Sequence, residues 1–465
     1  QPGEVLRVEY TGGELFADQS VLRLRGRYYT PDDRRGSITE HTLRRDGEVF
    51  RGAVALPDSV RFAVFAVEDL EGRRLDSNRG ELWEILVHEK GGRPTADALA
   101  AGVMHYARTD PGRAARAAAA LTARYPDEPR SWALRVTTDL DLLDSGTGLE
   151  DYARHQERFQ RRLKRGWTPT AEQRAWLALM TLALDDDAAA DAWLRGVGTD
   201  PGASRVIHEA RAIQAVRQNG HRTGRLLAAL DSLWTEAGVP IPAASDLGWK
   251  LALMMKSEEA AERWLPRYRR GLDWYYPARV VPELADAFGP AYALRWGLEN
   301  RTRIAGSQAV RPLTMTTPRH ERLRRRDQQR VLASLALLAR SVGEMETART
   351  LALEALDLAW CTQALSDVGQ VLLAAGDSSA ALEAFARAAA DPVAADVPAA
   401  IRASPQWPAR LDHARSELTR EVMADAVVRF VKARLTVPGT GERVTLQDAI
   451  GVGPSVVAFL ARCGP

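Results

Sequence analysis

The sequence predicts a multidomain α+β protein in which a small antiparallel β-sandwich comes first and a long α-helical solenoid follows. Over residues 1–92, short apolar segments have the period of strands and are separated by Gly, Pro, Asp and Asn. From 93 onwards the apolar period changes to that of helices and stays so until about 435. The domains expected are therefore 1–92, 93–435 and a short C-terminal segment, 436–465.

The composition is that of a globular chain with enough apolar residues for sizeable cores. Of the 465 residues, 45% are hydrophobic and 27% are charged, which is close to the average for such proteins. The formal net charge of +2 gives no overall attraction to nucleic acid or to an anionic membrane surface. No apolar run approaches the roughly 18–20 residues that a membrane-spanning helix needs. We therefore expect no nucleic-acid partner and no transmembrane segment.

The N-terminal domain is expected to contain seven short strands. Leu22 and Leu24 alternate with arginines, which is the period of a strand that buries one face. About seven strands within roughly 90 residues are typical of an antiparallel sandwich of immunoglobulin-like type. Carbohydrate or surface binding by this sandwich is one functional hypothesis, although no residue of the domain points to it. The strand segments are 4–10, 20–29, 37–45, 48–56, 59–69, 72–76 and 81–89.

Two helical hairpins repeat each other at an interval of 33 residues within 332–392. The second hairpin has a small residue on its first helix, a glycine at its turn and three spaced residues on its second helix: Gly369, Gly376, Ala381, Phe385 and Ala388. The residues 33 positions earlier are Ala336, Gly343, Ala348, Ala352 and Ala355. Small residues recur where two helices approach closely, and glycine recurs where the chain reverses.

This spacing resembles the tetratricopeptide repeat, in which a small residue and a turn glycine precede an alanine, an aromatic residue and an alanine. The spacing of small, aromatic, small and proline residues recurs at Ala189, Trp193, Gly196 and Pro201. The resemblance implies an α-solenoid over 93–435, in which each hairpin buries its apolar face against its neighbours. Units of this kind bind or space other polypeptides, so the resemblance implies a protein partner and no chemistry of the repeat itself.

The C-terminal segment contains a spaced set of residues that ends in Cys-Gly-Pro: Val444, Leu446, Asp448, Gly451, Pro454, Val456, Val457, Phe459, Cys463, Gly464 and Pro465. This set resembles the opening of a thioredoxin domain of the extracytoplasmic TlpA-like branch. The segment departs from the family because Arg462 stands where the family has Trp, and because three residues separate Phe459 from Cys463 where the family usually has four. The sequence also stops before a second cysteine.

That missing cysteine bears on the chemistry. A dithiol oxidoreductase uses one low-pKa thiolate to attack and a second thiol to resolve the mixed disulfide. Cys463 has no such partner, since the other cysteine of the chain is the distant Cys361. The enzyme hypothesis is therefore a thiol–disulfide oxidoreductase with Cys463 as its redox thiol, whose catalytic domain is cut off after Cys463-Gly464-Pro465.

Aromatic residues concentrate within 249–296, between the well-matched hairpins. Some are spaced by four, as Trp264 and Tyr268 are, and so share a helix face. Aromatic and arginine enrichment is typical of the hot spots of protein interfaces, while packing between irregular helices is the alternative. The predicted partner-binding residues are Trp249, Trp264, Tyr268, Arg269, Trp274, Tyr275, Tyr276, Tyr292 and Trp296.

Other polar clusters point to no cofactor and no metal. The eight histidines are dispersed, and the acidic triplet 185–187 fits an N-capping turn better than a calcium loop. The arginines of 319–330 form the strongest local positive charge, but Glu321 and Asp327 interrupt them. A solvated helix face is favoured there over a nucleic-acid patch, and an acidic protein surface is the other candidate for a ligand.

The function expected is that of a non-catalytic interaction or scaffold subunit, which binds or spaces partner proteins through its helical repeats. The sequence begins Gln1-Pro2 without an initiator Met, and a strand-like segment starts almost at once at Val5. We therefore expect that a secretory signal has been removed and that the protein works outside the cytoplasm, in a periplasm or at a cell surface.

Overall fold

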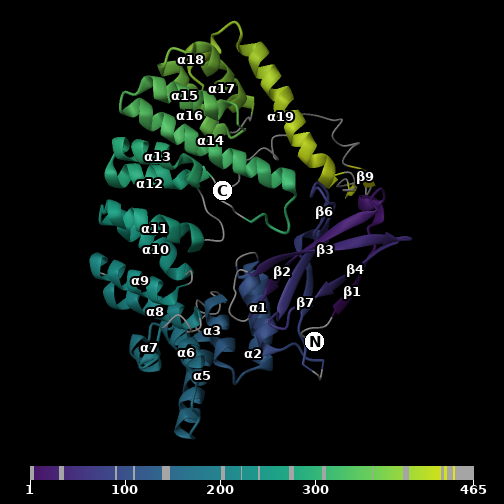
Figure 1. Cartoon of the computed structure of the whole chain (residues 1–465), viewed down its shortest axis with the longest axis vertical. Helices are drawn as coiled ribbons and strands as arrows, with labels where there is room; N and C mark the ends of the chain where they lie inside the picture. Colours follow the sequence, from purple (N-terminus) through teal and green to yellow (C-terminus); the bar gives the residue numbers. More distant parts are fainter. Residues whose placement is uncertain are drawn as a thin grey trace. The chain divides into compact units, whose positions relative to one another are not determined.

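Figure 1 shows a computed structural model of the chain, which describes residues 5–430 apart from internal gaps, and also 434–436 and 443–445. The gaps are 31–35, 90–91, 108–109, 139–146, 200–204, 221, 239–240, 272–276, 306–309, 359 and 391–396. Two compact units divide the chain: the first holds Gln1–Leu70 and Leu75–Asp273, and the second holds Glu71–Arg74 and Trp274–Pro465. The expected α+β layout, in which strands precede a long run of helices, is confirmed.

The strands of the first unit form one antiparallel sheet. They are β1 (Val5–Tyr10), β2 (Val21–Tyr29), β3 (Ser37–Asp46), β4 (Val49–Ala55), β5 (Phe62–Glu68), β6 (Leu75–Asp76) and β7 (Trp83–Leu86). Their order is β1-β4-β3-β2-β5-β6, and β7 also pairs with β5. The predicted sandwich of two facing sheets is therefore corrected. Strand β2 bonds to β3 on one side and to β5 on the other, with Leu24 opposite both His41 and Val67, so the ladder is continuous.

The sheet curls into a half-barrel around its own apolar core. The hydroxyl of Tyr10 on β1 donates a hydrogen bond to Asp76 Oδ2 on β6 at 2.7 Å, and the Tyr10 ring meets Trp83 of β7 edge-on with centroids 5.7 Å apart. A single sheet can bury one face only by curling or by packing on another element. The residues inside the curl include Phe16, Leu22, Leu43, Phe50, Val54 and Phe65.

Helix α1 (Ala96–Tyr106) packs on the outer face of the sheet. Strand β5 is buried along its whole length, since its alternate residues meet the core inside and α1 outside. The Tyr29 hydroxyl lies 2.6 Å from His105 Nδ1 of α1, and the Phe62 ring lies 5.8 Å from the His105 ring. The sheet and the first helix thus share one compact unit.

The remaining helices of the first unit follow in close succession. They are α2 (Pro111–Arg124), α3 (Pro129–Thr138), α5 (Thr147–Lys164), α6 (Ala171–Ala183), α7 (Asp187–Leu194), α8 (Arg205–Asn219), α9 (Thr223–Ala237), α10 (Pro242–Met254) and α11 (Glu258–Gly271). Thr170 caps α6: its hydroxyl accepts from the Gln173 N–H, and the Gln173 side chain accepts from the Thr170 N–H.

The second unit is also helical. It contains α12 (Pro277–Phe288), α13 (Pro290–Ala305), α14 (Thr317–Ser341), α15 (Met345–Leu356), α16 (Thr362–Ala374), α17 (Ser378–Ala390), α18 (Ala399–Arg402) and α19 (Trp407–Phe430), then the paired strands β8 (Arg434–Thr436) and β9 (Arg443–Thr445). Of the thioredoxin-like residues, Val444 lies in β9 and the others lie outside the described residues. In the part of the chain that the structure describes, no helix has the length and apolarity to cross a membrane.

The two repeated hairpins, α14–α15 and α16–α17, reverse through the same turn. Gly376 N donates to Leu373 O at 3.1 Å, and the following N–H donates to Leu372 O at 2.9 Å. Bonds of 3.1 and 2.9 Å recur 33 residues earlier, around Gly343. The φ angles of Gly376 and Gly343 are 80° and 85°, which is the left-handed conformation of a Schellman turn, where glycine is preferred.

Small residues let the paired helices approach, as the sequence predicted. A Cβ at Gly369 of α16 would lie 2.9 Å from the ring of Phe385 of α17. In the first hairpin the equivalent positions Ala336 and Ala352 are fully buried. The prediction of two equivalent helical hairpins is therefore confirmed.

Two more hairpins, α6–α7 and α10–α11, use this turn without a glycine. Asp185 and Lys256 occupy the left-handed position with φ of 57° and 50°. Lys256 N donates to Leu253 O at 2.9 Å, and Ser257 N donates to Ala252 O at 3.2 Å. The residue after each left-handed position caps the next helix in three of the four hairpins: Asp186, Ser257 and Asp377.

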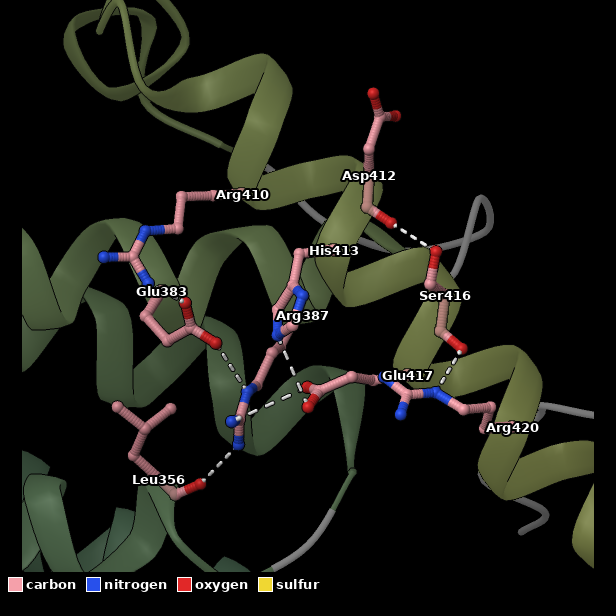
Figure 2. Close-up of polar contacts among 9 residues, drawn as sticks. All are labelled: Leu356, Glu383, Arg387, Arg410, Asp412, His413, Ser416, Glu417 and Arg420. Carbon is pink, nitrogen blue, oxygen red and sulfur yellow. Dashed lines mark hydrogen bonds and ion pairs between the residues drawn. The ribbon is translucent and has the colours of Figure 1, made fainter.

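Helix α19 is fastened to α17 by apolar and charged contacts. The apolar contact is made by Ala386, Ala390, Ala414 and Leu418. Figure 2 shows Arg387 among the polar contacts: it donates to the Leu356 carbonyl at 3.0 Å and to Glu383 at 2.9 Å, and it lies 3.8 Å from Glu417 of α19. Arg410 of α19 donates to Glu383 at 3.0 Å. Arg387, near the end of α17, thus contacts both the last residue of α15 and the middle of α19.

Candidate partner-binding surface

The predicted partner-binding residues are divided between the two units. Trp249 lies on α10, and Trp264, Tyr268 and Arg269 lie on α11 of the first unit. Those on α13 of the second unit are Tyr292 and Trp296. Outside the described residues are Trp274, Tyr275 and Tyr276.

The aromatic side chains of α10 and α11 form the packing between these helices. Trp249, Trp264 and Tyr268 are 1%, 0% and 3% exposed. Trp249 stacks on Tyr268 with ring centroids 5.8 Å apart and planes 15° apart. A Cβ at Gly248 would lie 2.3 Å from the Trp264 ring, so only glycine admits the indole there. In the structure these three residues therefore pack between α10 and α11, which agrees with the alternative interpretation of helix packing.

The aromatic residues of α13 also contact neighbouring helical residues. The Tyr292 ring lies 4.9 Å from the Phe288 ring of α12, and the Arg295 guanidinium lies 5.5 Å from the Tyr292 ring centroid. Trp296 is buried, and its carbonyl accepts a hydrogen bond from Asn300 at 2.9 Å. A partner-binding role for these residues remains a prediction.

An open pocket lies beside this aromatic packing, between α9 and α11. Its volume is about 450 Å³, and its lining residues are Asp231, Ser232, Thr235, Glu236, Arg263 and Arg267. Ser232, Thr235 and Glu236 are exposed on α9. We call this feature the α9–α11 pocket.

The floor of the α9–α11 pocket is fixed by a shared carboxylate. Asp231 accepts hydrogen bonds from Arg263, at 3.0 Å, and from Arg267. The Arg267 guanidinium lies 4.8 Å from the ring centroid of Trp264 and 5.7 Å from that of Trp234. A cation held between a carboxylate and two indole faces has little rotational freedom, so Arg267 is preorganised. Sequence reasoning found Trp264 but missed the pocket.

The charges that line the pocket balance, because two arginines face two carboxylates. Arg263 also donates to Glu259 at 3.1 Å, and Thr199 donates to Glu236 from outside the pocket. The lining residues include hydroxyls but no histidine or cysteine to act as a base or thiol nucleophile. Such a surface offers hydrogen-bond donors and acceptors of both charges, which suits binding better than covalent chemistry.

The residues that could carry chemistry elsewhere are few in the described ranges. No group of three or more His, Cys, Asp or Glu side chains is placed to hold a metal ion among the residues that the structure describes. Cys361 is buried before α16, and its Sγ lies 3.3 Å from Arg330 Nε. Cys463, the predicted redox thiol, lies outside the described residues, so the oxidoreductase hypothesis remains untested.

Comparison with known proteins adds no family to this geometry. No known family and no curated protein matches the chain. The function is therefore argued from the residues themselves.

Proposed function

We propose that this chain is a non-catalytic interaction subunit whose helical hairpins form a tetratricopeptide-like solenoid and bind a partner polypeptide. The surface of this chain that contacts the partner is the α9–α11 pocket. A location outside the cytoplasm, expected from the sequence, belongs to the same proposal. The observation that carries it is Arg267, which is held between Asp231 and two indoles beneath an exposed polar rim.

The chemistry of the pocket favours a polypeptide as its ligand. Protein-interface hot spots are enriched in Trp and Arg, and they lie in packed positions ringed by residues that exclude water. Here Arg267 lies in the floor against the buried Trp264, and Ser232 and Thr235 form the rim. Backbone amides and mixed polar side chains of a partner need both donors and acceptors, which this rim and floor supply. Because the floor is already ordered, binding costs less side-chain entropy.

The repeated turns support the solenoid part of the proposal. Four hairpins reverse at a left-handed residue with the same pair of backbone hydrogen bonds, at Asp185, Lys256, Gly343 and Gly376. A recurring turn of one geometry is typical of stacked helical hairpins, each of which buries its apolar face on its neighbour. Stacked helical hairpins commonly present an extended surface that binds other molecules.

The test fills the pocket from its exposed rim. Ser232→Arg and Thr235→Arg place a long side chain over the floor, and both positions are exposed, so the fold should be kept. The matched control is Ala120→Arg, at an exposed position of α2. Each purified variant is used as bait in the native source, after chemical crosslinking, and the captured proteins are quantified by mass spectrometry.

The expected result is a protein captured by the wild type and by Ala120→Arg, but recovered at least tenfold less with either pocket variant. Calorimetry should then show that the captured protein binds the wild type and Ala120→Arg more tightly than it binds either pocket variant. Equal recovery with all four proteins, at unchanged melting temperature, would remove the pocket from the proposal. Capture of no protein by the wild type would count against the interaction role itself.

A further inference from the structure

The N-terminal half of α14 carries a dense group of arginines. The α14 arginine surface consists of Arg319, Arg322, Arg324, Arg325 and Arg326. Helix α14 has 25 residues and its hairpin partner α15 has 12, so α14 continues past α15 (Figure 1). Gln329 Nε2 donates to the Ala355 carbonyl at 2.9 Å, which marks the end of α15. Residues 317–328 therefore extend about 18 Å beyond that end, at roughly 1.5 Å per residue.

The segment carries an excess of positive charge. Residues 317–328 hold five arginines and two carboxylates, Glu321 and Asp327, which gives a formal charge of +3. Arg324 and Arg325 are exposed, and Arg326 is half-buried. Within the described ranges, no ion-pair partner contacts Arg324, Arg325 or Arg326, and Arg326 Nε has no hydrogen-bond acceptor.

Burial weakens one of the two carboxylates that could compensate. Loss of hydration raises the pKa of Asp327 from 3.8 to about 6, although Arg330 lowers it in part. Glu321 is exposed, so its interactions are screened by solvent. Asp327 is still mostly ionised at pH 7, and with both acids ionised the segment keeps its formal charge of +3.

We propose that the α14 arginine surface binds an acidic segment of another polypeptide, whose carboxylates pair with Arg324, Arg325 and Arg326. The guanidinium fork matches a carboxylate in a bidentate pair, which a point-like ammonium cannot do. Helix α14 contains no Phe, Tyr or Trp on which bases would stack, so a carboxylate-rich polypeptide fits better than a nucleic acid. This inference rests on the proposed function only in that both assign a protein partner to the chain. The α14 arginine surface and the α9–α11 pocket are different surfaces.

The probe is a fluorescein-labelled peptide of twelve alternating Glu and Ser residues, and the readout is fluorescence anisotropy with the full chain. The test variant is Arg324→Gln, Arg325→Gln and Arg326→Gln combined. Its matched control removes the same charge from exposed arginines elsewhere: Arg116→Gln, Arg161→Gln and Arg165→Gln. A double variant that keeps the half-buried Arg326 serves if the triple variant has a lower melting temperature.

We expect the α14 variant to bind the peptide at least tenfold more weakly than the wild type, and the control to change affinity less than twofold. Raising NaCl from 50 to 300 mM should weaken the wild-type complex. Equal weakening in the control would show a general charge effect and overturn the proposal, as would undetectable wild-type binding. Tighter binding of a twelve-nucleotide poly(dT), lost in the α14 variant, would assign the surface to nucleic acid instead.

The outcome is separable from that of the α9–α11 pocket. Ser232→Arg should leave peptide affinity unchanged, because the pocket lies on other helices. Loss of peptide binding in the α14 variant together with a failed pocket test would leave this inference standing and the pocket refuted. If the pocket test succeeds and the α14 variant binds the peptide as well as the wild type does, this inference alone is refuted.

Discussion

Replacing Arg387 with leucine should weaken the docking of α19 on α17 without unfolding the rest of the second unit. The Arg387 guanidinium bonds the Leu356 carbonyl at 3.0 Å and Glu383 at 2.9 Å, and lies 3.8 Å from Glu417 (Figure 2). Its side chain is 23% exposed and that of Glu383 is 16% exposed, so solvent screens these contacts only in part. Leucine keeps most of the apolar volume but none of the donors.

The magnitude follows from the contacts that are lost. A hydrogen bond to a charged group contributes about 1.5–3 kcal/mol, and the longer pair with Glu417 adds at most about 1 kcal/mol. Glu383 keeps one partner, since Arg410 donates to it at 3.0 Å. Only the pair with Glu417 joins Arg387 to α19, because Leu356 and Glu383 belong to α15 and α17. We therefore expect a loss of at most about 1 kcal/mol for the docking of α19, which raises its opening equilibrium up to roughly fivefold, at about 1.4 kcal/mol per tenfold.

The assay is amide hydrogen exchange at pH 7, followed peptide by peptide over 407–420 and over the α14–α15 hairpin. Exchange in α19 should accelerate by the expected factor, while the hairpin should be unaffected. The control is Arg415→Leu, because Arg415 is 57% exposed and lies 3.8 Å from Asp412 of its own helix, so its loss should change exchange less than twofold. If Arg387→Leu behaves like this control, the pair between Arg387 and Glu417 does not help to hold α19.

Three further changes test the fold. Lys256→Gly should raise the free energy of unfolding by about 1 kcal/mol, because Lys256 has φ of 50° and glycine adopts that conformation freely; urea denaturation measures it. Gly248→Ala should lower it by about 1–3 kcal/mol, since the new Cβ would lie 2.3 Å from the Trp264 ring. Asp327→Asn should flatten stability between pH 4 and 6. Because burial raises the pKa of Asp327 to about 6, the native state of the wild type loses about 1–2 kcal/mol as pH rises through that window, after a discount for partial exposure.

Matched variants control these three. Lys250→Gly lies inside α10 and should destabilise by about 1 kcal/mol, the opposite sign to the turn position. Gly224→Ala should be nearly neutral, since its Cβ would meet its nearest neighbour at an ordinary 3.6 Å. Glu321→Gln removes an exposed carboxylate from the same helix as Asp327 and should leave the pH profile between 4 and 6 unchanged. If a variant changes the free energy of unfolding in the direction opposite to the expected one, the substitution acts mainly on the unfolded state.

Local patterns were enough to predict the elements and the repeated hairpins. The predicted segments 20–29 and 37–45 became β2 and β3 with little change at their ends. The 33-residue repeat was readable because small residues at the helix crossing and a glycine at the turn recur in sequence. The α10–α11 hairpin was missed because Lys256, and no glycine, stands at its left-handed position.

Which segments are strands and which are helices can be read from the sequence, because their apolar periods and turn residues are local. The surfaces against which those segments pack are visible only in the folded chain. Strand β2 lies between β3 and β5 in one curled sheet, although the strand count also fitted a sandwich. The aromatic cluster of α10 and α11 turned inward, and the α9–α11 pocket joined Asp231 to Arg267, 36 positions away. Such contacts depend on which surfaces pack together, and a one-dimensional pattern does not encode that choice.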